Sequence, residues 1–329
     1  MLIKYLMSPI FSGGMKMAKI LVTGANGQIG SELVVELRKK YGKENVIGLD
    51  LRDALPEISD GPFVVMDATD KIKLGKIIDQ HKITEIYHLV GILSATGEKN
   101  PELAWKVNME SLKAVLDFAK EKKLKVFWPS SIAAFGPTTP RDKTPQRTVL
   151  EPNTMYGVTK VAGELLCSYY NHKYGVDVRS VRFPGILSWK TPPGGGTTDY
   201  AVAIFYDVIQ KGEYTCFVSE GTVLPMMYMP DAIRSIIELM AADGKKLTVR
   251  TSYNLAAISF SAKELETALH KKVAKFGMKY VPDERQKIAD SWPKSIDDSA
   301  ARKDWGWKHK YGIDAIVDDM YSNLVKKLK

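Results

Sequence analysis

The fold of this chain is decided by the stretch Ile20-Leu21-Val22-Thr23-Gly24-Ala25-Asn26-Gly27-Gln28-Ile29-Gly30. The apolar run 20–22 predicts a buried strand, and the amphipathic segment 29–40 predicts a helix. Between them, Gly24 permits a tight turn, Gly27 lets backbone approach a phosphate, and Gly30 allows close packing of helix on strand. The unpaired N–H groups at the start of the helix then favour a pyrophosphate.

The residue at the end of the next apolar run suggests which dinucleotide is bound. Asp50 follows the run 46–49 and stands 20 residues after Gly30. A carboxylate there can accept hydrogen bonds from both adenosine ribose hydroxyls and repels a 2′-phosphate. We therefore expect NAD as the cofactor, bound also by Gln28 and Ile29 within the turn. Two alternatives stay open: Arg52 can meet a phosphate, and Asp50 can be only a turn residue.

Short apolar runs alternate with helix-length amphipathic segments through the first half of the chain. The expected strands are 20–22, 46–49, 63–66, 85–90, 125–128 and 178–182, and the expected helices are 29–40, 72–81, 103–122 and 156–174. This alternation predicts parallel strands joined by right-handed helical crossovers. The fold class is therefore α/β, with a Rossmann-type doubly wound parallel sheet.

The pattern becomes less regular after residue 185, beginning with the loop Pro192-Pro193-Gly194-Gly195-Gly196. We expect residues 17–185 to form an NAD-binding Rossmann domain. Residues 186–329 should form mainly a smaller α+β substrate-binding lobe, with some chain returning to the first domain. Residues 1–16 are interrupted by proline and glycine, and we expect a disordered extension or a weak targeting segment.

Composition limits the other classes of function. Hydrophobic residues make up 45% and charged residues 26%, which is typical of a globular protein. The net charge of +9 comes from scattered lysines, which favours a solvated surface over nucleic-acid binding. No apolar run approaches the roughly 18 residues of a membrane helix.

Cysteine and histidine usage points to a reducing compartment and to no metal. The two cysteines, Cys167 and Cys216, do not suggest a disulfide framework. The five histidines are dispersed, and no CxxC or HExxH spacing occurs. We expect a cytoplasmic protein, with mitochondria as the alternative because of the unexplained first 16 residues.

A tyrosine and a lysine four residues apart form the candidate catalytic pair. Tyr156 and Lys160 lie on one face of the expected helix 156–174. The lysine and a positively charged nicotinamide should both lower the pKa of the phenol. A phenolate could then take a proton from a substrate alcohol while hydride leaves its carbon. Ser131, 25 residues upstream and after a strand, completes the set.

Together these residues resemble the extended short-chain dehydrogenase/reductase superfamily over nearly the whole chain. The resemblance implies that Ser131 orients the reacting oxygen, Tyr156 is the acid/base, and Lys160 binds the nicotinamide ribose and tunes Tyr156. Further cofactor contacts that it implies are Asp67 at the adenine, Leu89 and Gly91 along the centre, Asn108, and Pro184 and Ile186 at the nicotinamide. For Asn108 an alternative stays open, in which its side chain only caps a helix and does not contact the cofactor.

The substrate class follows from the second half of the chain. Nucleotide-sugar enzymes of this superfamily usually carry an arginine-rich stretch that grips a diphosphate. The matching segment of this chain is Leu224-Pro225-Met226-Met227-Tyr228-Met229-Pro230-Asp231, which contains no arginine or lysine. Segments 129–136, 180–186, 193–201, 224–231, 291–293 and 297–298 instead resemble the short-chain L-threonine 3-dehydrogenase family.

That resemblance implies metal-independent oxidation of the β-hydroxyl of L-threonine to 2-amino-3-oxobutanoate, with NAD+ as oxidant. The glycine-rich loop and Thr197 and Thr198 could donate hydrogen bonds to the substrate carboxylate. Asp199 is a candidate acceptor for the ammonium group. Ser94 should lie near the nicotinamide and substrate, and Trp292 could form a wall that excludes water.

Other interpretations stay open from sequence alone. A nucleotide-sugar epimerase or dehydratase shares the fold, and some members of the superfamily are non-catalytic NAD-sensing regulators. The complete Ser131, Tyr156 and Lys160 set argues against a sensor. The superfamily commonly dimerises through the helices matching 103–122 and 156–174, so we expect a homodimer that binds a small molecule, without a nucleic-acid or membrane partner.

Overall fold

The computed structural model describes residues 18–328, so the extension expected at residues 1–16 lies outside the described residues. Seven parallel strands form the central sheet in the order β10-β6-β5-β4-β1-β2-β3. Their bounds are β1 Ile20–Thr23, β2 Val46–Asp50, β3 Phe63–Val65, β4 Glu85–His88, β5 Lys125–Ser131, β6 Val178–Phe183 and β10 Tyr253–Asn254. The first six strands follow the Rossmann order, which confirms the predicted fold class.

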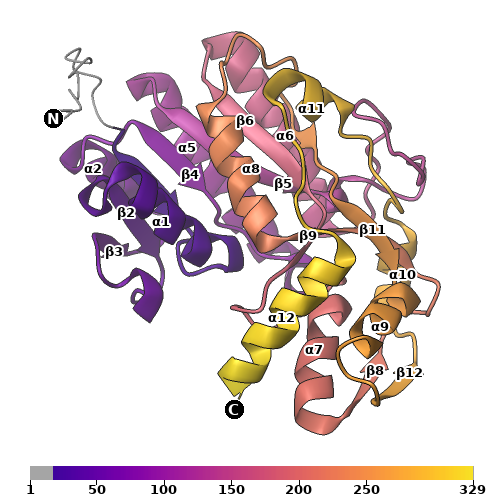
Figure 1. Ribbon diagram of the computed structural model, residues 1–329. Coiled ribbons are helices and arrows are strands. Elements are labelled where there is room, and N and C mark those ends of the chain that lie inside the picture. Colours follow the sequence, from indigo (N-terminus) through magenta and orange to yellow (C-terminus); the bar gives the residue numbers. More distant parts are fainter. Residues whose placement is uncertain (1–17, 329) are drawn as a thin grey trace, which may run out of the picture.

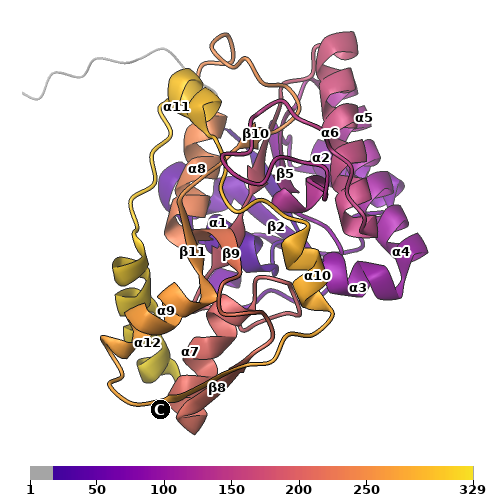
Figure 2. The same ribbon diagram turned by 90° about the vertical axis from the view of Figure 1, so that its right-hand side faces the viewer.

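Helices cover both faces of this sheet, as Figures 1 and 2 show. One face carries α1 (Gln28–Tyr41) and α8 (Met229–Ala241), whose apolar side chains join one core cluster. The other carries α2 (Lys71–Gln80), α5 (Ser111–Lys122) and α6 (Met155–Tyr174), which join a second cluster. Because both faces are covered, the inner strands are buried, as in β1, where all four residues are buried.

The expected helix 103–122 is divided in the structure. It consists of α4 (Pro101–Trp105), a π-helical turn (Lys106–Glu110) and α5, preceded by α3 (Ser94–Lys99). The Ser111 hydroxyl donates to the Val107 carbonyl oxygen at 2.5 Å inside this region. Asn108 lies in the π-helical turn and reaches the backbone of Ile92. Single π-helical turns are frequent at functional sites, and this one aims a side chain at the active-site edge.

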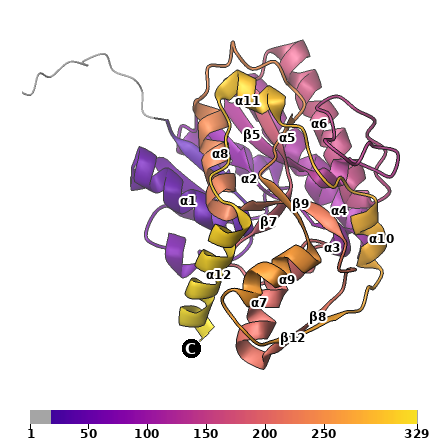
Figure 3. The same ribbon diagram turned by 45° about the vertical axis from the view of Figure 1, so that its right-hand side comes forward.

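The second lobe lies beside the carboxyl ends of the strands (Figure 3). It contains a three-stranded sheet, β11-β9-β7, and the pair β12-β8. Its elements are β7 Gly185–Leu187, β8 Glu213–Cys216, β9 Val223–Tyr228, β11 Ile258–Ser261, β12 Gly277–Tyr280, α7 Tyr200–Lys211, α9 Ala262–His270, α10 Arg285–Asp290 and α12 Ile313–Leu328. Their buried side chains form a third core cluster, which also includes Ile132, Ala133 and Phe135 from the turn after β5.

Later chain also returns to the first domain. Strand β10 pairs in parallel with β6, and α8 packs against α1. Helix α11 (Ser299–Trp305) adds Ala301 to the core on the α1 side of the sheet. The two lobes are therefore joined by several crossings of the chain.

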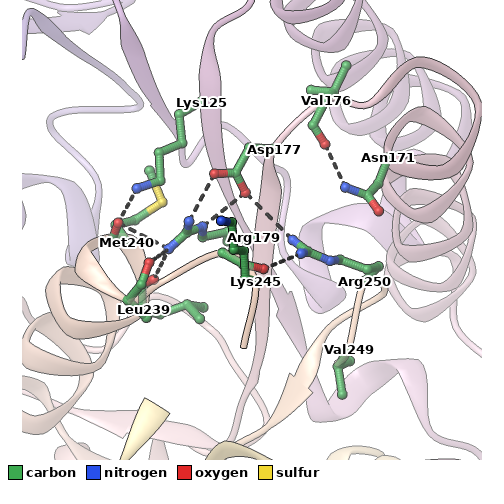
Figure 4. Close-up of polar contacts among 12 residues, drawn as sticks. Lys125, Asn171, Val176, Asp177, Arg179, Leu239, Met240, Lys245, Val249 and Arg250 are labelled. Atoms are coloured by element: carbon green, nitrogen blue, oxygen red, sulfur yellow. Dashed lines mark hydrogen bonds and ion pairs between the residues drawn. The ribbon is translucent and has the colours of Figure 1, made fainter. Parts of the chain in front are cut away.

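Arg179 joins strand β6 to helix α8 at the edge of the sheet away from the carboxyl ends (Figure 4). Its Nη1 donates to the carbonyl oxygens of Leu239, Met240 and Ala242 at 2.6, 3.2 and 2.7 Å. Its Nε and Nη2 donate to the Asp177 carboxylate at 3.0 and 2.9 Å. These carbonyls lie at the end of α8, where few N–H partners remain, although Leu239 also accepts from the Ala242 N–H at 3.2 Å. The guanidinium supplies further donors there and complements the helix dipole.

Arg179→Lys should lower the free energy of unfolding by about 1.5–3 kcal/mol, since an ammonium cannot reproduce the planar set of charged hydrogen bonds. Urea unfolding followed by circular dichroism measures this loss. Arg147→Lys, at an exposed arginine, is the matched control and should stay within about 0.5 kcal/mol of the wild type. Equal losses in the two variants would contradict the assigned role.

Candidate active site

The glycine turn has the backbone geometry that a pyrophosphate site needs. Gly24 has a φ of +74°, and its N–H donates to the Leu49 carbonyl oxygen at 2.9 Å, which anchors the turn on β2. A Cβ at Gly30 would lie 2.1 Å from the Gly24 carbonyl oxygen. Helix α1 begins after Gly27, which supplies no side-chain cap, and no acid occurs in the first turn. The helix N-terminus therefore fits an anionic diphosphate.

Two carboxylates stand at the adenosine end of this edge. Asp50 ends β2, and its two oxygens accept from the Asn26 N–H at 3.0 Å and the Leu51 N–H at 2.9 Å. The carboxylate is thus fixed directly beside the glycine turn, where the ribose of a dinucleotide is expected. Asp67 follows β3, is exposed, and accepts from the N–H and hydroxyl of Thr69 at 2.8 Å each. Its contact with adenine stays a prediction.

A cavity of about 180 Å³ lies at the carboxyl ends of the strands, between the two lobes. All the residues expected to contact substrate line it: Ser94, Ser131, Tyr156, Thr197, Thr198, Asp199 and Trp292. The expected cofactor residues that also line it are Gln28, Ile29, Leu89, Gly91, Tyr156, Lys160, Pro184 and Ile186. Segments separated by more than 200 residues in sequence are therefore brought to one site.

Asn108 supports the site from behind and does not line the cavity. Its Oδ1 accepts from the Ile92 N–H at 2.7 Å, and its Nδ2 donates to the Ile92 carbonyl oxygen at 3.2 Å. The same Nδ2 donates to the Thr159 hydroxyl at 3.1 Å. The amide therefore fixes the loop between Gly91 and Ser94 against the helix that carries Lys160.

Tyr156 and Ser131 both line the cavity, Tyr156 from the start of α6 and Ser131 from the end of β5. Thr154 caps helix α6 by accepting from the Gly157 N–H at 3.1 Å, which sets Tyr156 in the first turn. The Ser131 hydroxyl accepts from the Ala133 N–H at 3.2 Å, and its own proton can be directed at an oxygen in the cavity. Burial raises the pKa of Tyr156 to about 12, while the hydrogen bond with Ser131 opposes this rise.

Lys160 is buried beside the tyrosine ring, with Nζ 5.2 Å from the ring centroid. Its ammonium group donates to the Pro129 carbonyl oxygen at 2.6 Å. Burial lowers the pKa of Lys160 to about 8, against the attraction of Glu164, which raises it. Desolvation of the phenol therefore dominates the pKa of Tyr156 in this structure, and the expected lowering by Lys160 and a bound nicotinamide stays a prediction.

The glycine-rich loop is organised by Asp199. One carboxylate oxygen, Oδ2, accepts from the N–H groups of Gly194, Gly195 and Gly196 at 2.7, 2.8 and 2.8 Å. Three successive amides around an anion form a nest, and here the anion belongs to the protein itself. These amides are consequently engaged, whereas the hydroxyl-bearing Thr197 and Thr198 line the cavity.

Sequence reasoning missed a charged pair behind the serine. Ser130, which immediately precedes Ser131, donates its hydroxyl proton to Glu164 Oε1 at 2.6 Å. Glu164 is bound in turn by Arg182 at 2.6 Å. The available signals were an acid one helical turn after Lys160 and an arginine inside an apolar strand. Apolar lining residues that were also missed are Leu93, Pro129, Ile132 and Phe183.

The described part of the chain contains neither a candidate metal site nor a membrane-spanning helix. Within residues 18–328, no group of three or more His, Cys, Asp or Glu side chains is arranged to hold a metal ion. Over the same residues, none of the helices combines the length and the apolar character needed to cross a bilayer.

Comparison with known proteins identifies the family. Residues 20–256 match the NAD dependent epimerase/dehydratase family. An uncharacterized epimerase/dehydratase of Staphylococcus saprophyticus is 48% identical over 95% of this chain and 99% of its own length. A GalE-like L-threonine dehydrogenase from Cupriavidus necator, in its holo form, is similar in structure, with a TM-score of 0.91, 54% identity, and coverage of 93% of this chain and 99% of that one.

The L-threonine dehydrogenase from Clostridium difficile is also similar, with a TM-score of 0.92 and 49% identity over 94% of this chain and 98% of that one. The resemblance to L-threonine 3-dehydrogenases is thus confirmed along both lobes. The glycine turn, the fixed carboxylate of Asp50 and the uncapped start of α1 fit the cofactor that the family name implies. The chain belongs to the NAD dependent epimerase/dehydratase family, and its cofactor is NAD.

Proposed function

We propose that this protein oxidises the β-hydroxyl of L-threonine with NAD+, giving 2-amino-3-oxobutanoate, NADH and a proton. The observation that carries the proposal is the composition of the cavity. It joins the Ser131, Tyr156 and Lys160 set to three short hydroxyl side chains and Trp292 within about 180 Å³. Such a space suits a small alcohol, and the similar solved structures are L-threonine dehydrogenases.

The catalytic set can perform the proton transfer. Tyr156 would take the proton of the substrate β-hydroxyl while Ser131 holds the same oxygen by a hydrogen bond. A bound NAD+ would supply the acceptor for the hydride of the β-carbon. Lys160, protonated beside the phenol, favours the phenolate, and its position on the cavity wall suits the nicotinamide ribose. Trp292 is 6% exposed and closes one wall against water.

The substrate's charged groups have separate partners in this proposal. Hydroxyl groups of Ser94, Thr197 and Thr198 line the cavity and can donate to a carboxylate. The amides of the glycine-rich loop already bind Asp199, so the hydroxyls are the better donors. Asp199 brings a carboxylate to the cavity wall and is the proposed acceptor for the ammonium group.

Features of the second lobe disfavour the nucleotide-sugar alternative. Residues 224–231, where the sugar-nucleotide enzymes usually carry their cation, form β9 and the start of α8, and Met226 and Met227 are buried there. Asp231 is engaged by Arg234 at 2.7 Å and by the N–H groups of Lys310 and Tyr311. This stretch therefore builds the core and lacks the partner that a diphosphate would need.

We also propose a homodimer formed through α5 and α6. Apolar side chains on and near these helices are exposed, which costs solvation free energy in a monomer. They are Leu103, Trp105, Val158, Leu165 and Tyr169.

The two parts of the chain have different roles in this proposal: residues 17–185 would bind NAD, and residues 186–329 would mainly bind substrate. The two free, buried cysteines support a cytoplasmic location.

The substrate assignment is tested by NADH absorbance after removal of metals with a chelator. L-threonine should give the highest kcat/KM among L-threonine, D-threonine, L-allo-threonine and L-serine. UDP-glucose and dTDP-glucose are included and assayed for epimerised or dehydrated products. Absence of NADH formation with L-threonine, or turnover of a nucleotide sugar, would overturn the proposal.

Tyr156→Phe should lower kcat by about 10²–10⁴-fold, because the general base is lost. The dissociation constant of NADH, measured by fluorescence, should stay within about twofold, since the ring is kept. Tyr174→Phe removes the hydroxyl of an exposed tyrosine at the far end of the same helix and should leave kcat unchanged. If Tyr156→Phe mainly weakens NADH binding, Tyr156 is not the base.

Asp50→Ala should raise KM for NAD about 10- to 100-fold, because hydrogen bonds from the ribose to a charged acceptor are each worth about 1.5–3 kcal/mol. Discrimination against NADP should fall, since the repulsion of a 2′-phosphate disappears. Asp53→Ala, at an exposed neighbouring acid, is the matched control. An unchanged preference between NAD and NADP in the Asp50 variant would refute this role.

A further inference from the structure

An ion pair that is almost completely buried lies directly behind the catalytic serine. The side chains of Glu164 and Arg182 are 1% and 3% exposed. Arg182 binds both carboxylate oxygens, through Nε to Oε1 at 2.8 Å and through Nη2 to Oε2 at 2.6 Å. Taking two charges out of water is costly, so such a pair is weak support for stability by itself. Its location points to another role.

On one side, Glu164 of the ion pair is hydrogen-bonded to strand β5, which ends in the catalytic serine. Ser130 pairs with Arg182 in the β5–β6 register and donates to Glu164 Oε1 at 2.6 Å. The preceding residue, Pro129, accepts from the ammonium group of Lys160 at 2.6 Å. Helix α6 therefore binds the two residues immediately before Ser131, and the same helix carries Tyr156. The separation of Ser131 from Tyr156 is set by these contacts.

The second arm reaches the chain that carries Trp292. Arg182 Nη1 donates to Asn254 Oδ1 at 3.0 Å. Asn254 Nδ2 in turn donates to the carbonyl oxygens of Thr144 and Asp297 at 3.1 and 3.2 Å. Asp297 belongs to the segment that follows Trp292 and leads into α11. One guanidinium is thus connected through Glu164 to Ser130 and through Asn254 to the segment that follows Trp292.

We propose that Glu164 and Arg182 are positioning residues for the oxidation. They fix the positions of Ser131 and Lys160 relative to Tyr156, and they fix the position of the segment that carries Trp292 relative to these three residues. The inference rests on the proposed function, because it assigns the residues that align that reaction. Charge-assisted hydrogen bonds suit the task, since they are short and directional. A displacement of about 1 Å at a catalytic group can cost about 100-fold in rate.

The carboxylate also acts on the charge of Lys160. Glu164 follows Lys160 by one helical turn and raises its pKa against the larger effect of burial, which lowers it to about 8. His88 on β4 is fully buried, and burial lowers its pKa to about 3, so it is neutral near pH 7. The titratable and charged groups around Lys160 are Tyr156, Glu164 and Cys167 on α6 and His88 on β4, with Arg182 of β6 bound to Glu164. Neutralising Glu164 should therefore deprotonate Lys160 at lower pH.

Two substitutions separate the charge from the geometry. Glu164→Gln keeps an oxygen that can accept from Ser130 but removes the negative charge. Arg182→Lys keeps the positive charge but loses the planar set of donors. Arg179→Lys is the matched control, because it changes an arginine of the same strand whose side chain is 4% exposed. That arginine binds the end of α8 at the opposite end of β6.

With L-threonine at saturation, Glu164→Gln and Arg182→Lys should each lower kcat about tenfold or more. KM for NAD should change less than about threefold, because the adenosine site is untouched. Arg179→Lys should keep the wild-type kcat even though its Tm falls. If the Glu164 and Arg182 variants keep wild-type kcat while their Tm falls as in the control, the pair is only structural and the inference is wrong.

The second readout needs no substrate. NADH binding, measured by fluorescence from pH 6 to 10, should weaken as Lys160 loses its proton. Glu164→Gln should move this midpoint down by about one pH unit, a tenfold change in proton affinity, whereas Arg179→Lys should not move it. An unmoved midpoint in Glu164→Gln overturns the electrostatic part of the inference. Failure of the wild type to oxidise L-threonine would contradict the proposed function without affecting this measurement.

A milder variant covers the case in which the charged-pair variants do not fold. Ser130→Ala removes only the hydrogen bond to Glu164 and leaves the ion pair in place. It should lower kcat several-fold with the Tm near that of the wild type, because one of the two contacts that place Ser131 is lost. Wild-type kcat in Ser130→Ala would show that this arm does not position the serine.

Discussion

The backbone of α1 approaches the end of β1 at Gly30 more closely than any side chain allows. A methyl group at Gly30 would lie 2.1 Å from the Gly24 carbonyl oxygen, and one at Gly24 would meet the backbone of Leu89 at 3.0 Å. This contact places the start of α1 at the carboxyl edge of the sheet, where its free N–H groups can meet a diphosphate. The cofactor, and hence the position of the nicotinamide relative to Tyr156, depends on that approach.

Around this fixed edge, polar side chains hold the reactive groups from behind. Asn108 binds the loop before Ser94, Lys160 binds Pro129, and Glu164 binds Ser130. Each of these bonds is at least partly buried, where an unmade hydrogen bond costs more than in water. The cavity walls are therefore set by bonds whose loss would leave a buried polar group unsatisfied. Such support is what keeps a catalytic set aligned within a fraction of an ångström.

Burial and neighbouring polar groups shift the pKa values of Tyr156 and Lys160 in opposite directions. Desolvation raises the pKa of Tyr156 to about 12 and lowers that of Lys160 to about 8. Ser131 and Glu164 each oppose the effect of burial on their neighbour by a hydrogen bond or by attraction. The site is thus tuned by several contributions of opposite sign. The positive charge that a bound oxidised nicotinamide brings would further favour the phenolate.

The sequence by itself determined the parallel sheet and the glycine turn, and it predicted the roles of Asp50 and of the Ser131, Tyr156 and Lys160 set. Each of these depends on residue spacing within one or two neighbouring elements. Only the tertiary structure decided that the amides of the glycine-rich loop bind Asp199, that Asn108 lies in a π-helical turn, and that Glu164 pairs with Arg182. These features depend on contacts between segments that are distant in sequence. The pKa of a buried side chain likewise depends on the groups packed around it. The local sequence pattern does not specify which distant residue a side chain contacts or how dry its surroundings are.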